Sequence, residues 1–290
     1  LHEHMLEYHG DVNLMKGAIY AADYVTTVSP TYASELQYDF FAHGLAGVVS
    51  DNRHKLRGIL NGIDTALYDP AKDPGLIQHF SARSMAGKKK CKAALQEAVG
   101  LNVNPNVPII ACVSRLVKHK GFELVSAALS EIMGMDVQMV VLGTGDWNFE
   151  ETFRHAQNQY PGRFAAKIMY SSSLSTAIYG GADLFLMPSI AEPCGLSQMI
   201  AMRYGTLPIV RETGGLRDSV VPHMAPGGNG FTFADINVHD MVWVIREAVD
   251  LYHNDQKAWK ALMKNAMTAD FSWTRSAAAY LEIYGWLTLG

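Results

Sequence analysis

The sequence predicts an α/β fold with a doubly wound parallel sheet, and two observations support this. From residue 108 onward, short apolar and β-branched segments alternate with segments of helical period, and a glycine-rich or polar turn follows each apolar segment. These apolar segments lack the polar alternation of a half-exposed strand, so they suit strands that helices cover on both faces. A parallel sheet with helices on both sides is therefore expected.

The strands and helices of this domain can be placed in chain order. The expected strands are 108–114, 137–143, 164–170, 182–189, 207–212 and 231–235. The helices between them are expected at 121–133, 148–160, 173–180, 196–205 and 215–221. Two more helices, 237–253 and 255–269, follow the last strand, and Ser272 is placed as the N-cap of a final amphipathic helix.

The first part of the chain is expected to be the end of a second sheet. A helical segment leads into the strand-like run "YVTTVSP" and then into a helix over "TYASELQYDF". Residues 65–85 contain Asp-Pro twice and little periodicity, which is typical of a linker. The expected domains are 1–64 as the end of an N-terminal domain, 65–100 as linker and first helix, 101–270 as the doubly wound domain, and 271–290 as a helix that packs back on the N-terminal domain.

Composition excludes several classes of partner. The chain has 290 residues, 49% of them hydrophobic, and a net charge of -4, which gives no electrostatic reason to expect nucleic acid or an acidic membrane. The basic run "KKKCK" at 88–92 is expected to be the solvated face of a helix. The three cysteines show no C-x-x-C pairing, which favours a reducing compartment without disulfides or thiolate-bound zinc. No apolar run approaches the ~20 residues of a membrane helix.

The junctions after the strands are candidate sites, because chemistry collects at the carboxyl ends of parallel strands. After the first strand, "SRLVKHKG" carries Arg115 and Lys120 beside Gly121. Two cations with such reach, next to a glycine that frees the helix N-terminus, would suit a diphosphate. Two solvated surface cations are an equally good interpretation of this motif alone.

Other junctions carry weaker signals. Gly143 belongs to "GTGD", which lacks the full dinucleotide fingerprint, so a plain turn is favoured, although it permits close approach of a ligand. Tyr170 ends a strand and could stack on a flat base or simply pack at the rim. Thr213, Gly214 and Gly215 precede a helix whose free N–H groups would attract phosphate, whereas a tight turn is the alternative.

Glu192 is a lone carboxylate between an apolar strand and an apolar helix. It could orient sugar hydroxyls or balance positive charge at an anomeric carbon, or it could be a helix N-terminal charge without chemical function. No second carboxylate lies in the motif, so hydrolysis by two acids is not indicated. Gly195 supplies a helix start nearby, and Cys194 is expected to be a small buried residue.

Several motifs, in their order along the chain, resemble the bacterial glycogen synthase and plant starch synthase family of retaining glycosyltransferases. They are "YAADYVTTVSPTYASEL", "GILNGID", "SRLVKHKG", "EPCGLSQMIAMRYGTLPIVRETGGLRDSV" and "DFSW". The resemblance implies a GT-B fold, with a complete Rossmann-like C-terminal domain at 101–270 that binds a sugar nucleotide. It also implies that 1–64 is the last part of the acceptor-side N-terminal domain.

The resemblance implies a hexosyltransferase that transfers glucose from ADP-glucose to the non-reducing end of an α-1,4-glucan with retention. Its partners would be the sugar nucleotide and the glucan, with no metal and no cofactor. Its location would be the cytoplasm in a bacterium or the plastid in a plant. The choice of ADP-glucose over UDP-glucose and the oligomeric state do not follow from the motifs.

Family membership also implies roles for particular residues. Arg115 and Lys120 would hold the diphosphate and stabilise its leaving charge, and Glu192 would lie beside the donor glucose. Asn61 would lie where the two domains meet the sugar, and Tyr170 would stack on the adenine. The other residues implied to bind the donor are Gly143, Cys194, Gly195, Leu196, Thr213, Gly214 and Gly215.

Two departures from the family pattern qualify these roles. Ile200 stands where the wider superfamily often has a second glutamate, as is usual in the starch and glycogen synthase branch. The family's N-terminal lysine-glycine-glycine motif has no counterpart in this sequence. If the 290 residues are the whole polypeptide, an exposed apolar edge on 1–62 and little synthase activity are expected. The alternative function is an inactive fragment, or a remnant that binds nucleotide sugar or glucan.

Overall fold

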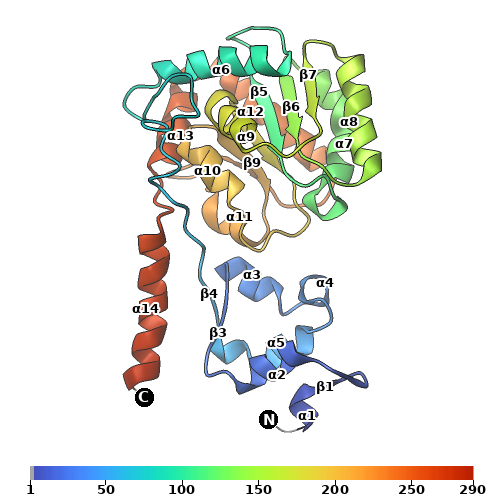
Figure 1. The fold of residues 1–290 in the computed structure, drawn as a ribbon, viewed down its shortest axis with the longest axis vertical. Helices are drawn as coiled ribbons and strands as arrows, with labels where there is room; N and C mark the ends of the chain where they lie inside the picture. The colour runs from blue at the N-terminus through green and yellow to red at the C-terminus, as the bar shows by residue number, and fades with distance from the viewer. Residues whose placement is uncertain (1–2, 290) are drawn as a thin grey trace.

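The larger part of the molecule is a six-stranded parallel sheet with helices on both faces (Figure 1). The computed structural model describes residues 3–289. The strand order is β10-β9-β8-β5-β6-β7, and every neighbouring pair is parallel. The strands are β5 (Ile109–Val113), β6 (Gln138–Leu142), β7 (Phe164–Lys167), β8 (Leu184–Met187), β9 (Leu207–Arg211) and β10 (Phe231–Phe233). The predicted doubly wound fold is confirmed.

The helices of this part follow the predicted alternation and begin and end within a few residues of their expected bounds. They are α6 (Ala86–Val99), η2 (Lys118–Lys120), α7 (Phe122–Met133), α8 (Trp147–Gln159), α9 (Ser172–Gly181), α10 (Ser197–Arg203), α11 (Gly214–Ser219), α12 (Val238–Asn254) and α13 (Gln256–Thr268). Helix α6 packs against α9, while α7 packs against α8 and α12. The central strands β5, β6 and β8 are almost wholly buried between these layers, which explains their unbroken apolar sequences.

The N-terminal part is small and has its own core. Its elements are α1 (Glu3–Leu6), β1 (Glu7–Tyr8), β2 (Asp11–Val12), α2 (Leu14–Ala21), β3 (Val25–Thr27), α3 (Pro30–Glu35), α4 (Asp39–Ala42), α5 (Ala46–Asp51), η1 (Arg53–Lys55) and β4 (Leu56–Gly58). Strand β3 pairs in parallel with β4. The core consists of Ile19, Val48 and Val49, whereas Val12 and Leu14 are exposed.

One helix of this part differs from its prediction. The expected helix over 31–40 is two helices, α3 and α4, because the backbone at Tyr38 is extended. Ser29 caps α3 by accepting a hydrogen bond from the Tyr32 N–H, and Pro30 occupies the first helical position. The break places Asp39 in the first turn of α4, where a negative charge is favourable.

The chain passes twice between the two parts. The Ile63 N–H donates to the Phe271 carbonyl at 2.8 Å, and the Ser276 hydroxyl donates to the Leu60 carbonyl at 2.6 Å. Helix α14 (Trp273–Leu289) then runs beside the N-terminal part, where the Trp286 ring lies 5.9 Å from the Tyr24 ring (Figure 1). The second passage thus brings the C-terminal helix back to the N-terminal part.

In the region between the parts, Ser272 lies where it was predicted, directly before α14, and the structure adds detail to the segment predicted as a linker. Residues 65–85 contain no helix or strand, but they are not a free linker, because Leu76 and Phe80 are buried in the main core. Ser272 directly precedes α14, and its backbone N–H donates to the Asp270 carboxylate at 2.9 Å. This N–H and the Ser272 side chain lower the pKa of Asp270.

The basic run at 88–92 is not a solvated face, contrary to the prediction. Lys88 and Lys92 are buried, whereas Lys89 and Lys90 are exposed. Residues four apart share one face of a helix, and in α6 this face is turned inward. Lys92 Nζ lies 2.8 Å from the Asp183 carboxylate, and Lys88 Nζ donates to backbone and hydroxyl oxygens. These partners offset the desolvation of the two charges.

Candidate functional site at the carboxyl edge of the sheet

Lys120 and Glu192 form an ion pair at the carboxyl edge of the sheet. Their Nζ and Oε2 atoms are 2.6 Å apart, although the residues follow different strands, β5 and β8. Glu192 is only 6% exposed, and its Oε2 also accepts a hydrogen bond from the Ser189 hydroxyl at 3.0 Å. A charge-assisted contact of this length, largely removed from water, orients both side chains. The structure therefore joins two residues that were predicted from separate motifs.

A glycine allows the two loops to meet. Gly121 adopts a φ of +81°, and a Cβ there would lie 2.0 Å from the Pro188 carbonyl oxygen. No residue with a side chain fits this position without moving the backbone. The Ile190 N–H also donates to the His119 carbonyl at 2.9 Å, so the loop of Lys120 is held directly against the loop of Glu192.

Arg211 supports the loop of Glu192 from the end of β9. Its Nε donates to the Ser189 carbonyl at 2.9 Å, and its Nη2 donates to the Ile190 carbonyl. Burial lowers the pKa of Arg211, and the negative charge of Glu35 partly opposes this effect. Arg211 was not among the residues predicted from the sequence. A charged residue at the end of an apolar strand was the available signal.

The turn at residues 213–215 packs against the same loop. A Cβ on Gly214 would lie 2.0 Å from the Glu192 carbonyl oxygen, and one on Gly215 would lie 2.0 Å from the Cys194 carbonyl oxygen. The Gly215 N–H donates to the Glu192 carbonyl at 3.1 Å. The paired glycines therefore have a structural purpose, which is close backbone approach between the two loops.

This turn is not open, and in this respect the structure differs from the expectation. The Gly214 N–H lies 3.1 Å from both carboxylate oxygens of Glu35, and the Thr213 hydroxyl donates to Glu35 at 2.8 Å. Glu35 ends α3 of the N-terminal part and was not predicted as a site residue. Donors that were expected to receive a phosphate thus hold a carboxylate in this structure. The position suits an anion because N–H groups at a helix start are unsatisfied within the helix.

Asp218 makes a second contact between the parts. Its carboxylate accepts from the Ser29 hydroxyl and the Thr31 hydroxyl, each at 2.5 Å, and from the Thr31 N–H at 3.0 Å. Because Asp218 lies in α11, α3 contacts this short helix at both of its ends. The signal in the sequence was weak, since a single Asp in a helix gives no hint of a partner nearly two hundred residues away.

Arg115, Gly143 and Tyr170 share a cavity of about 220 Å³ beyond the ends of β5, β6 and β7. Tyr170 is 91% exposed, so its ring is open to solvent. The Arg115 side chain is exposed and makes no ion pair or hydrogen bond with any residue from 3 to 289. Burial, Lys120 and Arg115 together lower the pKa of His119. This edge therefore presents positive charge beside a small cavity and a free aromatic ring.

Asn61 reaches the motif that follows β8. Burial raises the pKa of the Cys194 thiol, and a hydrogen bond from the Asn61 backbone partly opposes this effect. Such a thiol is a poor nucleophile, in agreement with the expected structural role. Gly195 has a φ of +68°, and Leu196 is partly exposed beside it. Asn61 thus lies at the crossing between the two parts, in a cavity that Pro30 and Asp218 also line.

Two further features were looked for among the described residues, a metal-binding cluster and a membrane-spanning helix. Between residues 3 and 289, no group of three or more His, Cys, Asp or Glu side chains is arranged to bind a metal ion. Over the same range, no helix combines the length and apolar character of a membrane span.

Fold and site together define a glycosyltransferase of the GT-B type, and comparison with known proteins identifies the family. Residues 96–266 match the model described as Glycosyl transferases group 1, and residues 1–51 match the model described as Starch synthase catalytic domain. The chain belongs to the glycosyl transferases of group 1.

Two of the similar proteins are glycogen synthases, in agreement with the resemblance that the motifs predicted. The chain is 48% identical to a glycogen synthase of Alkaliphilus metalliredigens (strain QYMF) over 96% of its own length and 59% of the relative. It is likewise 48% identical to a glycogen synthase of Bacillus licheniformis, over 96% of its own length and 58% of the relative. The chain therefore spans less than two thirds of the curated relatives that it matches.

A solved structure supports the same assignment. The catalytic domain of starch synthase IV from Arabidopsis thaliana, bound to ADP and acarbose, superposes with a TM-score of 0.88 at 39% identity. The match covers 95% of this chain and 58% of that one. The predicted GT-B fold and the resemblance to glycogen and starch synthases are confirmed.

Proposed function

We propose that this chain carries the donor-binding machinery of a retaining α-1,4-glucan synthase. The proposed reaction transfers glucose from ADP-glucose to the non-reducing end of an α-1,4-glucan. The observation that carries the proposal is the pair of Lys120 with the buried Glu192 carboxylate, beside the unpaired Arg115 at the carboxyl edge of the sheet. The ADP and acarbose bound to the related starch synthase support a nucleotide donor and a glucan-like acceptor.

The cations are proposed to act on the leaving group. Breaking the bond between the anomeric carbon and the diphosphate leaves negative charge on a phosphate oxygen and positive charge on the sugar. Arg115 has no anionic partner among the described residues, so its guanidinium is free to hold the diphosphate. Lys120 would then be shared between the diphosphate and Glu192, which holds its ammonium at the sheet edge.

Glu192 is proposed to face the donor glucose. Its carboxylate can orient sugar hydroxyls and stabilise positive charge at the anomeric carbon, while the backbone of Cys194, Gly195 and Leu196 contacts the sugar. No nucleophile is assigned. The acceptor hydroxyl would form its bond to the anomeric carbon from the leaving-group side, and the departing phosphate oxygen would take the hydroxyl proton.

The remaining contacts with the donor are proposed from where the residues lie at the carboxyl edge of the sheet. Tyr170 would stack on the adenine, and Gly143 would let the nucleotide approach the backbone. A phosphate could reach the Gly214 N–H only if the Glu35 carboxylate left it. Donor binding at residues 213–215 would therefore alter the contact between α3 and α11, and Asn61 would face the acceptor side of the same junction.

The proposal includes no metal and no cofactor beyond the donor substrate. Its partners are ADP-glucose and an α-1,4-glucan, and ADP-glucose is preferred to UDP-glucose because the related starch synthase binds ADP. We place the activity in the cytoplasm, or in the plastid if the chain comes from a plant. The three free, buried cysteines fit such a reducing compartment.

A second candidate function is donor or glucan binding without turnover. The relatives extend well beyond the matched region, because the chain covers only 58% to 60% of them. Groups contributed by the rest of such a protein are not needed to bind the nucleotide at Arg115 and Lys120, but they could be needed for transfer.

One pair of measurements tests both functions. The chain is incubated with radiolabelled ADP-glucose and glycogen, and ADP-glucose binding is measured by calorimetry. Label in polymer that disappears in Lys120→Ala supports the synthase, whereas binding without incorporation supports the second function. Lys118→Ala is the matched control, since Lys118 lies on the same loop but pairs with the exposed Glu123. No binding of ADP-glucose, or equal binding by Lys120→Ala, would contradict the proposal.

A further inference from the structure

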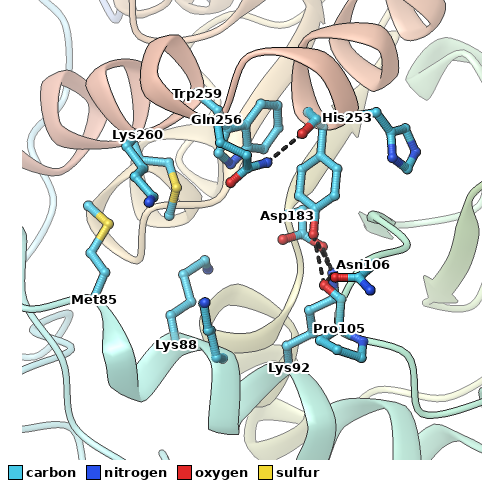
Figure 2. A pocket seen from close by; sticks show the side chains of 13 residues that line it. Met85, Lys88, Lys92, Pro105, Asn106, Asp183, His253, Gln256, Trp259 and Lys260 are labelled. Atoms are coloured by element: carbon cyan, nitrogen blue, oxygen red, sulfur yellow. Dashed lines mark hydrogen bonds and ion pairs between the residues drawn. The ribbon is translucent and has the colours of Figure 1, made fainter.

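A second cavity, of about 450 Å³, lies at the opposite edge of the sheet (Figure 2). Asn106 precedes β5 and Asp183 precedes β8, so the cavity is at the amino ends of the strands. Helix α6 forms one wall, and the end of α12 with the start of α13 forms the other. The proposed donor site uses none of its residues. Its volume is within the range of small-molecule sites.

Two buried lysines in this cavity already have structural partners. Lys92 Nζ lies 2.8 Å from Asp183 and also donates to the Tyr252 hydroxyl at 2.8 Å. Lys88 Nζ donates to the Tyr204 carbonyl and the Thr206 hydroxyl, each at 2.8 Å, and has no carboxylate in contact. Asp183 is the one carboxylate among the described residues that line the cavity, and it faces four lysines, so the lining retains an excess of positive charge.

The side chains of two further lysines in the lining have no partner. Lys89 and Lys260 are exposed, and neither ammonium group forms a hydrogen bond or ion pair with any other described residue between 3 and 289. They come from opposite walls, Lys89 from α6 and Lys260 from α13. Figure 2 shows Lys260 extending from its helix toward the α6 wall that carries Lys88. An anion between the walls would be met by cations from both sides.

The same cavity has an apolar portion. Met85, Met263 and Trp259 line it, and the Trp259 ring packs edge-on against the Tyr252 ring with centroids 5.0 Å apart. Trp259 is only 3% exposed, because its ring also stacks on the Phe231 ring with centroids 6.4 Å apart, so it forms the fixed floor of this portion. A flat or ring-shaped group fits against such a wall better than a free inorganic ion does.

We propose that this cavity binds a phosphorylated small molecule that carries a sugar or similar ring. Its phosphate group lies between Lys89 and Lys260, and its ring lies against Met85 and Trp259. A phosphate monoester is favoured over a single carboxylate because a dianion is matched by two otherwise unpaired cations. The site differs from the donor site in its sheet edge, its helices and all of its residues.

The burial of Lys88 leads to a second expectation for this cavity, which concerns proton uptake when a ligand binds. Burial without a carboxylate contact lowers the pKa of Lys88 to about 7. The charged or titratable groups that act on it are Asp183, Cys91 and Lys92. The cavity lining adds Lys89, Tyr252, His253 and Lys260. An anion in the cavity would raise the pKa of Lys88, so binding near neutral pH is accompanied by proton uptake.

Calorimetry on the whole chain tests the proposal with ribose 5-phosphate and inorganic phosphate as probes. Ribose 5-phosphate is expected to bind more tightly than inorganic phosphate. The double variant Lys89→Gln, Lys260→Gln is expected to weaken it by about tenfold or more. Lys257→Gln, Lys264→Gln is the matched control, because both residues are exposed on α13 outside the cavity. Lys120→Ala changes the donor site alone, so it is expected to leave the affinity for ribose 5-phosphate unchanged.

Three outcomes would overturn this inference. They are no binding of either probe at millimolar concentration, an equal loss in the control double variant, or loss of binding in Lys120→Ala. Equal affinity for ribose 5-phosphate and inorganic phosphate would contradict the role of the ring wall. Titration in buffers of different ionisation enthalpy measures the proton uptake, which is expected to diminish in Lys88→Met.

Discussion

Lys120 and Glu192 are in direct contact, with Nζ and Oε2 2.6 Å apart, although seventy-two positions separate them in the chain. Each is the counter-charge of the other at the carboxyl edge of the sheet. A diphosphate that binds there must share Lys120 with a buried carboxylate instead of meeting a free lysine. The pair therefore orients Lys120 before the donor arrives, and it couples donor binding to the position of Glu192.

Lys120→Ala is expected to weaken ADP binding by about tenfold or more, because a charge-assisted contact to the diphosphate is lost. Calorimetry with ADP measures this effect. Lys118→Ala should stay within about twofold of the unmodified chain, because Lys118 is exposed and pairs with Glu123. An effect of similar size in both variants would show that general surface charge, and not the Lys120–Glu192 pair, determines binding.

Glu35→Gln is expected to strengthen ADP binding severalfold. The Glu35 carboxylate occupies the Gly214 N–H and the Thr213 hydroxyl, and a neutral amide competes less well with phosphate for these donors. ADP titrations of the variant and the unmodified chain measure the difference. Glu131→Gln, an exposed change on α7, is the control. Weaker ADP binding in Glu35→Gln would show that Glu35 supports the donor site instead of competing for it.

Tyr170→Ala is expected to weaken ADP binding by about fivefold or more, since stacking of a base on an aromatic ring contributes roughly 1–3 kcal/mol. Pyrophosphate has no base, so its affinity should not change. The comparison of the two ligands by calorimetry isolates the ring contact. Equal losses for ADP and pyrophosphate would place Tyr170 at the phosphates or would indicate a disturbed loop.

Gly215→Ala is expected to destabilise the fold by roughly 1–3 kcal/mol, because its Cβ would lie 2.0 Å from the Cys194 carbonyl oxygen. Gly47→Ala in α5 is the matched control. A Cβ at Gly47 meets nothing within 4 Å, and the change should be neutral or stabilising by up to about 1 kcal/mol. Denaturant unfolding of both variants measures the difference, and equal stabilities would contradict the close approach of the two loops.

Lys88 should make stability depend on pH in the alkaline range. Its pKa is lowered from 10.5 to about 7 in the folded chain, mainly by burial. Between these values the unfolded chain binds the extra proton, so this residue makes stability rise as pH increases from about 7 toward 10.5. Unfolding free energies of the unmodified chain and Lys88→Met across this range should diverge with pH. Lys90→Met, an exposed change in α6, should leave the slope unaltered.

Much of the fold was predictable from local pattern. The six strands of the large sheet were placed because each is a short apolar or β-branched segment, and the central strands β5, β6 and β8 are almost wholly buried. Such segments differ clearly from the helices between them. The basic run at 88–92 was misplaced for the opposite reason. Its lysines have the composition of an exposed face, and only their distant partners, Asp183 and the end of α10, explain why two of them are buried.

The site was predictable where a motif carries a chemical group at a strand end. Arg115, Lys120, Glu192 and Tyr170 were all singled out on that basis, and the structure brings Lys120 into contact with Glu192. Glu35, Asp218 and Arg211 were missed. Each acts through a partner on another element, and no local pattern identifies a partner that lies tens or hundreds of residues away.

The sequence by itself determined the alternation of strands and helices, the edge of the sheet where charged residues gather, and the family to which the chain belongs. These properties depend on periodicity and on contiguous motifs, which are local. Tertiary structure alone decided that Lys120 is paired, that Glu35 fills the turn at Gly214, and that Lys88 and Lys92 line a second cavity. Such contacts depend on how distant segments pack, because an interaction between two charges is determined by their distance in space and by the water excluded around them.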